Sequence, residues 1–387
     1  MHVAMISDVY FPRINGVSTS IETFRNAFAP LGVRVSLVAP DYDAQAVADG
    51  LPWVHRIPAR RLPFDPEDRW MPYRHAGRRL HTLHQENPID LVHVQTPFVA
   101  HYAGLKLARQ HRIPVVTTYH TLFEEYLHHY VPLLPKRWMQ ALARHHSRKQ
   151  CNDVDAVVVP SSAMQHRLLA YGVTAPMHVV PTGIPLEQFH TGDGATFRTR
   201  LGIGPEQPVA LFVGRVAHEK NIGFLLEAMQ HVLLLAPDAV LVIAGEGPAR
   251  GDLERQAKAG TLNGHVRFVG YLDRVRELSD CYAAANVFAF ASRTETQGLV
   301  LLEAMSMGLP VVALSAMGTS DILTRGKGCV VPSDSPTDFG RHIGALLRDP
   351  ARRERLATEA RQYAGEWSAI AMAMRLRSLY RTLLGRF

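Results

Sequence analysis

Two glutamates eight residues apart, Glu295 and Glu303, flank a glycine-bearing turn and could recognise hydroxyl groups of a ligand. An ionised carboxylate only accepts hydrogen bonds and repels a phosphate, so the hydroxyls of a sugar or a ribose are its natural partners. Apolar residues between the glutamates recur at helical spacing, which predicts a helix that begins near Gly298 and ends at Gly308 and Pro310. This stretch alone is equally compatible with an ordinary core-facing helix that carries two surface glutamates.

The start of this predicted helix is a candidate anion site. Free N–H groups and the positive end of the helix dipole attract anions. Gly298 has no side chain, so the backbone can approach a ligand closely there. One loop and its helix could therefore hold a diphosphate, with a hydroxylated ring on either side.

Two cations in an earlier segment could neutralise the same diphosphate. Arg215 and Lys220 bracket the turn between a predicted buried strand at 209–213 and a predicted helix at 222–235. Cations placed beside a helix N-terminus can clamp a diphosphate. An arginine and a lysine five residues apart are also common on protein surfaces, so the spacing by itself does not establish a site.

The glutamate pair around QGLVLLEAM, followed by GLPVV, resembles the signature of retaining glycosyltransferases of family four. The resemblance implies the GT-B fold: an α/β protein with two Rossmann-like, doubly wound domains that face one another across a cleft. It also implies that Glu303 holds the ribose of the donor, that Glu295 holds a sugar hydroxyl, and that Gln297, Gly298 and Leu299 belong to the donor site. The ETQG form, with Gln297 where many members carry Phe, is similar to glycolipid-forming members such as diacylglycerol glucosyltransferases and mannosyltransferases.

Two features of the N-terminal half are similar to the same family. The loop DVYFPRINGV resembles the family's loop beside the acceptor and the diphosphate, which would bring the backbone at Gly16 near a phosphate. Asp8 in that loop either marks the site or caps local structure. His120 follows a predicted strand, at the carboxyl end where parallel sheets bind ligands. A lone histidine is most often structural, but the matching histidine of the family lies against the donor sugar.

The resemblance further implies a mechanism without a metal or another cofactor. Arg215 and Lys220 look like the residues that contact the nucleotide's phosphates, where they would stabilise the negative charge of the leaving diphosphate. His120 would orient or stabilise the sugar. No residue stands out as a covalent nucleophile, and the family implies a front-face route in which the leaving phosphate helps to deprotonate the acceptor. Residues 41–43 and 153–155 both spell Asp-x-Asp, but each abuts a strand-like run, and we expect neither to bind a metal.

The elements that position these residues follow a strand, loop and helix pattern that starts twice. We expect an acceptor-side Rossmann-like domain at 1–183, a linker at 184–204, and a nucleotide-sugar-binding Rossmann-like domain at 205–366. In the resembling fold, the last helix, here 367–387, crosses back onto the first domain, with Trp367 as the pivot.

Length and composition agree with a two-domain protein in a reducing compartment. The chain has 387 residues, of which 47% are apolar, a length and a content that suit two cores. Its three cysteines are far apart and match no metal or disulfide framework. We see no secretory signal and no apolar run long enough to span a membrane, so we expect a cytoplasmic location. The net charge of +7 suits anionic partners, but no nucleic-acid signature accompanies it.

Residues 136–150, KRWMQALARHHSRKQ, form the most basic segment and predict an amphipathic helix. A basic helix with Trp138 suits an anionic membrane surface, and would place the enzyme peripherally on the inner face of the membrane. The alternative is an ordinary surface helix whose Trp138 packs on its own domain. Upstream, Glu124, Glu125, His128 and His129 lack a fixed metal-ligand spacing, and we expect a solvated or acceptor-facing helix there.

Together these features predict transfer of a hexose, with retention, from a UDP- or GDP-sugar to an acceptor hydroxyl, on a lipid or lipid-linked acceptor at the membrane surface. Transfer to a soluble sugar or small molecule is one alternative. A GT-B sugar-nucleotide epimerase or hydrolase is another, as is a non-catalytic protein that binds nucleotide sugars. A phosphorylase would need a lysine that anchors its cofactor, for which the sequence offers no candidate.

Overall fold

The structure, a computed structural model, forms two compact units. Unit 1 contains Met1–Gly183 and Ala369–Phe387, and unit 2 contains Ile184–Ser368. The described residues are 1–42, 51–62, 65–120, 136–258, 260–274 and 276–385. Each unit is built around its own parallel sheet, so the predicted α/β class with two Rossmann-like halves is confirmed.

Unit 1 contains a seven-stranded parallel sheet in the order β3-β2-β1-β6-β7-β8-β9. These strands are β1 (His2–Ile6), β2 (Arg34–Pro40), β3 (Val54–Ile57), β6 (Leu91–Val94), β7 (Val115–Thr118), β8 (Ala156–Val159) and β9 (Met177–Val179). The helices are α1 (Gly16–Phe28), α2 (Tyr73–Glu86), α3 (Val99–His111), α5 (Lys136–Asn152), α6 (Ser162–Ala170) and α14 (Ala369–Leu383). A separate hairpin pairs β4 (Arg60–Leu62) with β5 (Asp65–Trp70).

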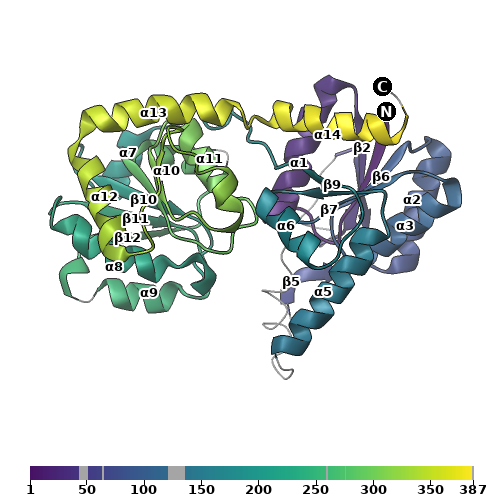
Figure 1. The fold of residues 1–387 in the computed structure, drawn as a ribbon, viewed down its shortest axis with the longest axis horizontal. Helices are drawn as coiled ribbons and strands as arrows, with labels where there is room; N and C mark the ends of the chain where they lie inside the picture. The colour runs from purple at the N-terminus through teal and green to yellow at the C-terminus, as the bar shows by residue number, and fades with distance from the viewer. Residues whose placement is uncertain (43–50, 63–64, 121–135, 259, 275, 386–387) are drawn as a thin grey trace. The chain divides into compact units, whose positions relative to one another are not determined.

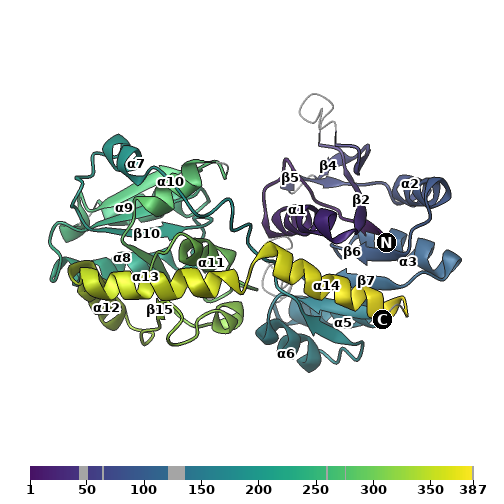
Figure 2. The same ribbon diagram turned by 90° about the horizontal axis from the view of Figure 1, so that it is seen from above.

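The two faces of this sheet are covered by different helices. Figures 1 and 2 show α1 and α14 on one face and α2 and α3 on the other. Every residue of β1 is buried, as expected for a central strand covered on both faces. The chain reverses its winding direction between β1 and β6, and parallel sheets bind ligands at the carboxyl ends of the strands beside such a switch point.

Unit 2 contains a six-stranded parallel sheet in the order β12-β11-β10-β13-β14-β15. These strands are β10 (Val209–Val213), β11 (Val240–Ala244), β12 (Val266–Gly270), β13 (Val287–Phe290), β14 (Val311–Ala313) and β15 (Cys329–Val330). The helices are α7 (Gly194–Arg200), α8 (Ile222–Leu233), α9 (Arg250–Ala257), α10 (Glu277–Ala283), α11 (Leu299–Ser306), α12 (Pro336–Arg348) and α13 (Pro350–Gly365). Four of the strands, β10, β11, β13 and β14, are buried along their whole length.

The structure differs from the expected linker at 184–204. These residues belong to unit 2, where Phe189 and Phe197 are buried in the hydrophobic core. The backbone N–H of Ile184 donates to the carbonyl of Trp367 at 2.9 Å, so the segment also pairs with the end of the unit. Polar residues and glycines predominate in this segment and favour a connection, but its few large apolar side chains anchor it in the core of unit 2.

Candidate active site

Helix α11, which follows the turn after β13, lies where the spacing of apolar residues predicted a helix. Helix α11 begins at Leu299, directly after Gly298, whose φ of 95° lies in the left-handed region that favours glycine. A Cβ atom at Gly298 would also lie 3.2 Å from the methyl group of Thr319. Leu301 and Leu302 bury the opposite side of the helix. The N–H of Leu301 donates to the carbonyl of Gly298 at 3.0 Å. The N–H groups of Leu299 and Val300, in the first turn of α11, have no intrahelical acceptor and can meet an anion.

The side chains of Lys220 and Glu295 meet across unit 2. The Nζ atom of Lys220 lies 2.5 Å from Oε1 of Glu295, and both side chains are largely buried, at 17% and 16% exposed. Lys220 ends the short helical turn that follows β10. The next residue, Asn221, donates from its side-chain amide to the carbonyl of Ala291 at 3.1 Å, which ties this turn to the end of β13. Two residues predicted for one site are thus brought together.

Arg215 lies on the same turn with its side chain exposed. Within the described residues its guanidinium makes no hydrogen bond or ion pair, so its charge is available to a ligand. The turn itself is fixed by close backbone packing. A Cβ atom at Gly245 would lie 1.9 Å from the carbonyl oxygen of Gly214, and one at Gly247 would lie 2.3 Å from that of Val216.

Glu303 lies deeper than its predicted partner, with a side chain that is only 2% exposed. Its Oε1 atom forms an ion pair with Arg274, and its Oε2 atom accepts a hydrogen bond from the hydroxyl of Tyr282 at 2.9 Å. The charge of Glu303 raises the pKa of Arg274, and burial raises the pKa of Tyr282 well above its usual value. Sequence reasoning missed both partners. Arg274 follows the carboxyl end of β12, and that position was the available signal.

Gln297 is buried between these two glutamates, at 6% exposed. The turn at 317–321 packs against this part of the loop. Gly318 donates its N–H to the carbonyl of Glu295 at 2.8 Å, and a Cβ atom there would lie 2.1 Å from the carbonyl oxygen of Thr296. Contacts between backbone atoms thus hold residues 295–297 in place, whatever their side chains contact.

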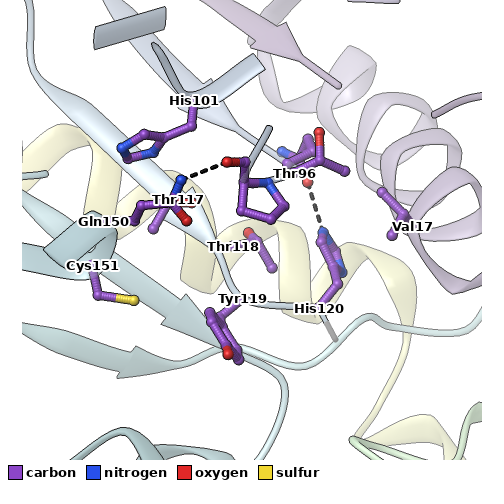
Figure 3. A pocket seen from close by; sticks show the side chains of 11 residues that line it. Val17, Thr96, His101, Thr117, Thr118, Tyr119, His120, Gln150 and Cys151 are labelled. Atoms are coloured by element: carbon purple, nitrogen blue, oxygen red, sulfur yellow. Dashed lines mark hydrogen bonds between the residues drawn. The ribbon is translucent and has the colours of Figure 1, made fainter. Parts of the chain in front are cut away.

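In unit 1, His120 lines a pocket at the carboxyl ends of β6 and β7 (Figure 3). Its Nε2 atom lies 2.9 Å from Oε1 of Gln95, and burial lowers its pKa to about 4. The ring is only partly covered, so it can reach a ligand while staying neutral near pH 7. Val17, at the start of α1, lines the same pocket.

Two further histidines beside this pocket are buried and neutral. His93 lies 2.6 Å from the hydroxyl of Tyr380, on α14, and 2.7 Å from the hydroxyl of Thr118. Burial lowers its pKa to about 3. His101 has a pKa lowered to about 4 by burial, and its buried Nε2 atom has no hydrogen-bond partner among the described residues. His93, His101 and His120 are therefore all neutral near pH 7.

The N-terminal loop has one structural residue and one accessible residue. Asp8 accepts hydrogen bonds from Thr96 at 2.7 Å and from the N–H of Ala100 at 3.2 Å, so it caps α3, and burial raises its pKa to about 6. Gly16 is the exposed first residue of α1, and a Cβ atom there would meet nothing within 4 Å. A ligand can approach the backbone at Gly16, but the backbone itself does not require glycine.

The Asp-x-Asp segment at 153–155 is occupied by structural contacts. Asp155 accepts the N–H of Val115 at 2.7 Å, and Asp153 pairs with Arg109 at 3.3 Å. Within the ranges that the structure describes, no group of acidic, histidine or cysteine side chains could hold a metal ion. Asp43 and the predicted set Glu124, Glu125, His128 and His129 lie outside the described residues.

The basic helix α5 exposes its aromatic residue. Trp138 is 76% exposed and Leu142, one turn later, is 58% exposed, whereas Met139 between them is buried. Trp138 therefore does not pack on its own unit, and an apolar stripe flanked by exposed arginines faces outward. None of the helices in the described residues has the length and apolar character that a membrane crossing requires.

Two family models together match most of the chain. Residues 14–188 match the model described as Glycosyltransferase Family 4, and residues 193–363 match the model described as Glycosyl transferases group 1. These two ranges contain Gly16 and His120 of unit 1 and the candidate donor residues of unit 2, whereas Asp8 precedes the first range.

Two curated relatives align with this chain over most of its length and of their own. The alpha-monoglucosyldiacylglycerol synthase of Streptococcus pneumoniae is 34% identical over 81% of this chain and 71% of its own. The GDP-mannose-dependent alpha-mannosyltransferase of Mycobacterium tuberculosis is 30% identical over 84% of this chain and 82% of its own.

Solved structures show the same fold. The sucrose-phosphate synthase of Thermosynechococcus elongatus superposes with a TM-score of 0.80 and 22% identity, over 100% of both chains. A glycosyltransferase involved in lipopolysaccharide biosynthesis gives a TM-score of 0.70 with 17% identity, over 98% of this chain and 99% of its own. These similarities confirm the GT-B fold class.

Proposed function

Because the chain belongs to glycosyltransferase family four, we propose that it transfers a hexose from a nucleoside-diphosphate sugar to a lipid hydroxyl at a membrane surface. Its relatives transfer glucose or mannose, so hexosyl transfer with retention is the activity of the chain. The observation that carries the proposal is the single loop and helix on which Glu295 meets Lys220 while Glu303 is held by Arg274.

Unit 2 carries the residues that we assign to the donor. Lys220 and Arg215 neutralise the charge that develops on the leaving diphosphate, which the N-terminus of α11 also attracts. Glu303 accepts hydrogen bonds from the ribose. Glu295, held by Lys220, keeps lone pairs for a sugar hydroxyl. Leu299 offers its backbone N–H to the diphosphate.

Two neighbours complete the donor assignment. Gln297, buried beside these residues, shapes the loop that receives the sugar, and Gly298 allows the backbone to approach the phosphates. In unit 1, neutral His120 keeps the role of orienting the sugar, and Gly16 offers an unobstructed backbone to a phosphate. A neutral imidazole can donate one hydrogen bond and accept another without repelling positive charge at the anomeric carbon.

The lipid acceptor is supported by α5 and by the relatives. A relative named for glucosyl transfer in glycolipid synthesis is 34% identical, and Trp138 and Leu142 present apolar side chains among exposed cations. Basic residues near an anionic membrane contribute ~1 kcal/mol each, so several together hold a protein peripherally on a bilayer. We therefore propose attachment to the cytoplasmic face of the membrane.

Product analysis tests the proposed reaction. UDP-glucose, UDP-galactose and GDP-mannose are supplied with vesicles that contain diacylglycerol or a glycosyl-diacylglycerol, and the lipid product is analysed by NMR. We expect a glycolipid with the donor's α configuration, formed equally well in the presence of EDTA. Release of free sugar without a glycolipid would favour a hydrolase, and transfer only to soluble sugars would replace the lipid acceptor.

Vesicle co-sedimentation tests the membrane surface separately. The charge-reversal variant replaces three exposed arginines of α5 with glutamate, at Arg137, Arg144 and Arg148. The matched control makes the same change at three exposed arginines elsewhere, Arg341, Arg355 and Arg375. Only the α5 variant should fail to co-sediment with anionic vesicles at low salt. It should keep its activity on a short-chain soluble acceptor. Wild-type protein that ignores anionic vesicles would contradict the membrane proposal.

A further inference from the structure

We infer that Arg274 and Tyr282 are positioning residues that hold Glu303 as a two-pronged acceptor for the adjacent 2′- and 3′-hydroxyls of the donor's ribose. The inference rests on the proposed function, because that function assigns Glu303 to the ribose. It adds Arg274 and Tyr282, which compensate the buried carboxylate of Glu303.

Burial makes Glu303 dependent on its neighbours. An ionised carboxylate that loses its water pays a large desolvation penalty unless hydrogen bonds and an opposite charge replace the water. The side chain of Glu303 is 2% exposed, and the Arg274 guanidinium supplies the opposite charge at Oε1. The hydroxyl of Tyr282 donates to Oε2 at 2.9 Å. Both oxygens are therefore compensated by a protein donor.

The arrangement leaves acceptor capacity for two hydroxyls. The two oxygens of an ionised carboxylate offer about four lone-pair sites. Arg274 uses one site on Oε1, and Tyr282 uses one site on Oε2. One site remains on each oxygen, which matches two neighbouring hydroxyls of a ribose. Because the two protein donors fix the carboxylate plane, a ligand does not have to order it on binding.

Arg274 is itself held by the segment that the sequence suggested was a linker. Its guanidinium lies 5.8 Å from the centre of the Phe189 ring, and the side-chain amide of Gln188 donates to its backbone carbonyl. The hydroxyl of Ser306, at the end of α11, donates to the carbonyl of Phe189 at 2.6 Å. The helix that carries Glu303 is thus tied to the segment that supports Arg274.

The contrast with Glu295 supports a positioning role for Arg274 and Tyr282. Glu295 pairs with Lys220, which we assign to the diphosphate, so that cation is shared between protein and ligand. Tyr282 is wholly buried, and Arg274 is 30% exposed and covers a carboxylate that is far less accessible. Their contacts with Glu303 therefore form part of the unit's interior.

The test measures how strongly the protein distinguishes ribose from deoxyribose. Isothermal titration calorimetry gives Kd for UDP, 2′-deoxy-UDP, GDP and 2′-deoxy-GDP with wild-type protein, Tyr282→Phe and Arg274→Gln. We expect wild type to prefer the ribonucleotide of its own base by at least ~10-fold, the scale of one hydrogen bond to a charged group. In both variants this preference should fall to ~3-fold or less. The affinity for the deoxynucleotide, which keeps the 3′-hydroxyl, should fall by a smaller factor than the affinity for the ribonucleotide.

Two further variants separate positioning from general damage. Arg274→Lys keeps the charge and should restore part of the preference. Arg276→Gln removes an equal charge two residues away, from a side chain that is 80% exposed, and should leave the preference unchanged. Tyr282→Phe removes a single hydroxyl, so it decides the question if Arg274→Gln fails to fold.

The possible outcomes distinguish this inference from the proposed function. Wild-type protein that binds none of the four nucleotides would overturn both. Wild-type protein that binds nucleotide but ignores the 2′-hydroxyl would remove Glu303 from the ribose, and the inference with it. A preference that survives in both Tyr282→Phe and Arg274→Gln would overturn the inference alone.

Discussion

The two units differ in the ionisable side chains that they place at the carboxyl ends of similar parallel sheets. Unit 2 presents charges in pairs, with Lys220 on Glu295 and Arg274 on Glu303. In unit 1, burial lowers the pKa values of His93 and His120 to about 3 and about 4, so these groups are neutral near pH 7.

This difference matches the two chemical tasks that we propose for the units. A leaving diphosphate needs fixed positive charge, and a cation that is already oriented by a carboxylate stabilises it without reorganisation. A sugar that gains positive charge is better served by polar but neutral neighbours. In this proposal the same type of parallel sheet serves both tasks, and the side chains at the strand ends determine which task each unit performs.

Removing the cations of unit 2 should have the largest effect. We expect Lys220→Ala and Arg215→Ala each to reduce transfer by at least ~10²-fold, the cost of losing one stabiliser of developing charge. Steady-state kinetics with saturating donor measures the loss, and Arg293→Ala, an exposed arginine paired with Asp334, is the control. Near-normal rates in either variant would mean that the phosphates bind elsewhere.

The two glutamates should separate by the part of the ligand that each contacts. We expect Glu303→Ala to weaken binding of the bare nucleoside diphosphate by ~10-fold, because a hydrogen bond to a charged group is lost. Glu295→Ala should leave that binding intact and impair sugar transfer. Calorimetry with the bare nucleotide, beside transfer assays, measures both effects, and equal losses of nucleotide affinity would contradict the assignment.

Acid should destabilise unit 1, because its buried histidines resist protonation. The pKa of His101 is lowered to about 4, whereas an unfolded histidine titrates near ~6.5. Between these values the unfolded chain binds more protons, so the free energy of unfolding falls as the pH drops from ~6.5 toward 4. Asp8, with a pKa raised to about 6, opposes this trend, but it is one group against His93, His101 and His120.

Urea unfolding at pH 7.5 and pH 5 measures this effect in each unit. Single-tryptophan variants that retain Trp53 report on unit 1, and those that retain Trp367 report on unit 2. The Trp53 transition should shift to lower urea in acid by more than the Trp367 transition. His101→Leu should reduce the shift, and a change at the exposed His178 should not. Equal shifts in the two units would contradict the electrostatic comparison.

The sequence predicted the local parts of this arrangement better than the long-range ones. The helix after Gly298, the strand before His120 and the turn at Lys220 follow from hydrophobic periodicity and from turn residues, which act over a few positions. Arg274 was missed because its partner, Glu303, is 29 residues away, and nothing local indicates that pairing.

The segment at 184–204 shows the same limit. Its glycines, prolines and polar residues indicate a connection, and only Phe189 and Phe197 carry it into the core. Similarly, the helical spacing of 136–150 could not show whether Trp138 faces the protein or solvent, because that depends on what unit 1 places beside α5.

Because α14 is made last, unit 1 cannot complete its folding before unit 2 has been synthesised. Residues Met372, Leu376 and Tyr380 of α14 fill the core of unit 1 against α1, although the 185 residues of unit 2, Ile184–Ser368, are made between Gly183 and this helix. At roughly 5–20 residues per second, the first 183 residues wait on the order of 10–40 seconds for their last helix. During that interval the apolar side of α1 lacks its partner, so nascent unit 1 exposes this apolar surface until α14 has been synthesised.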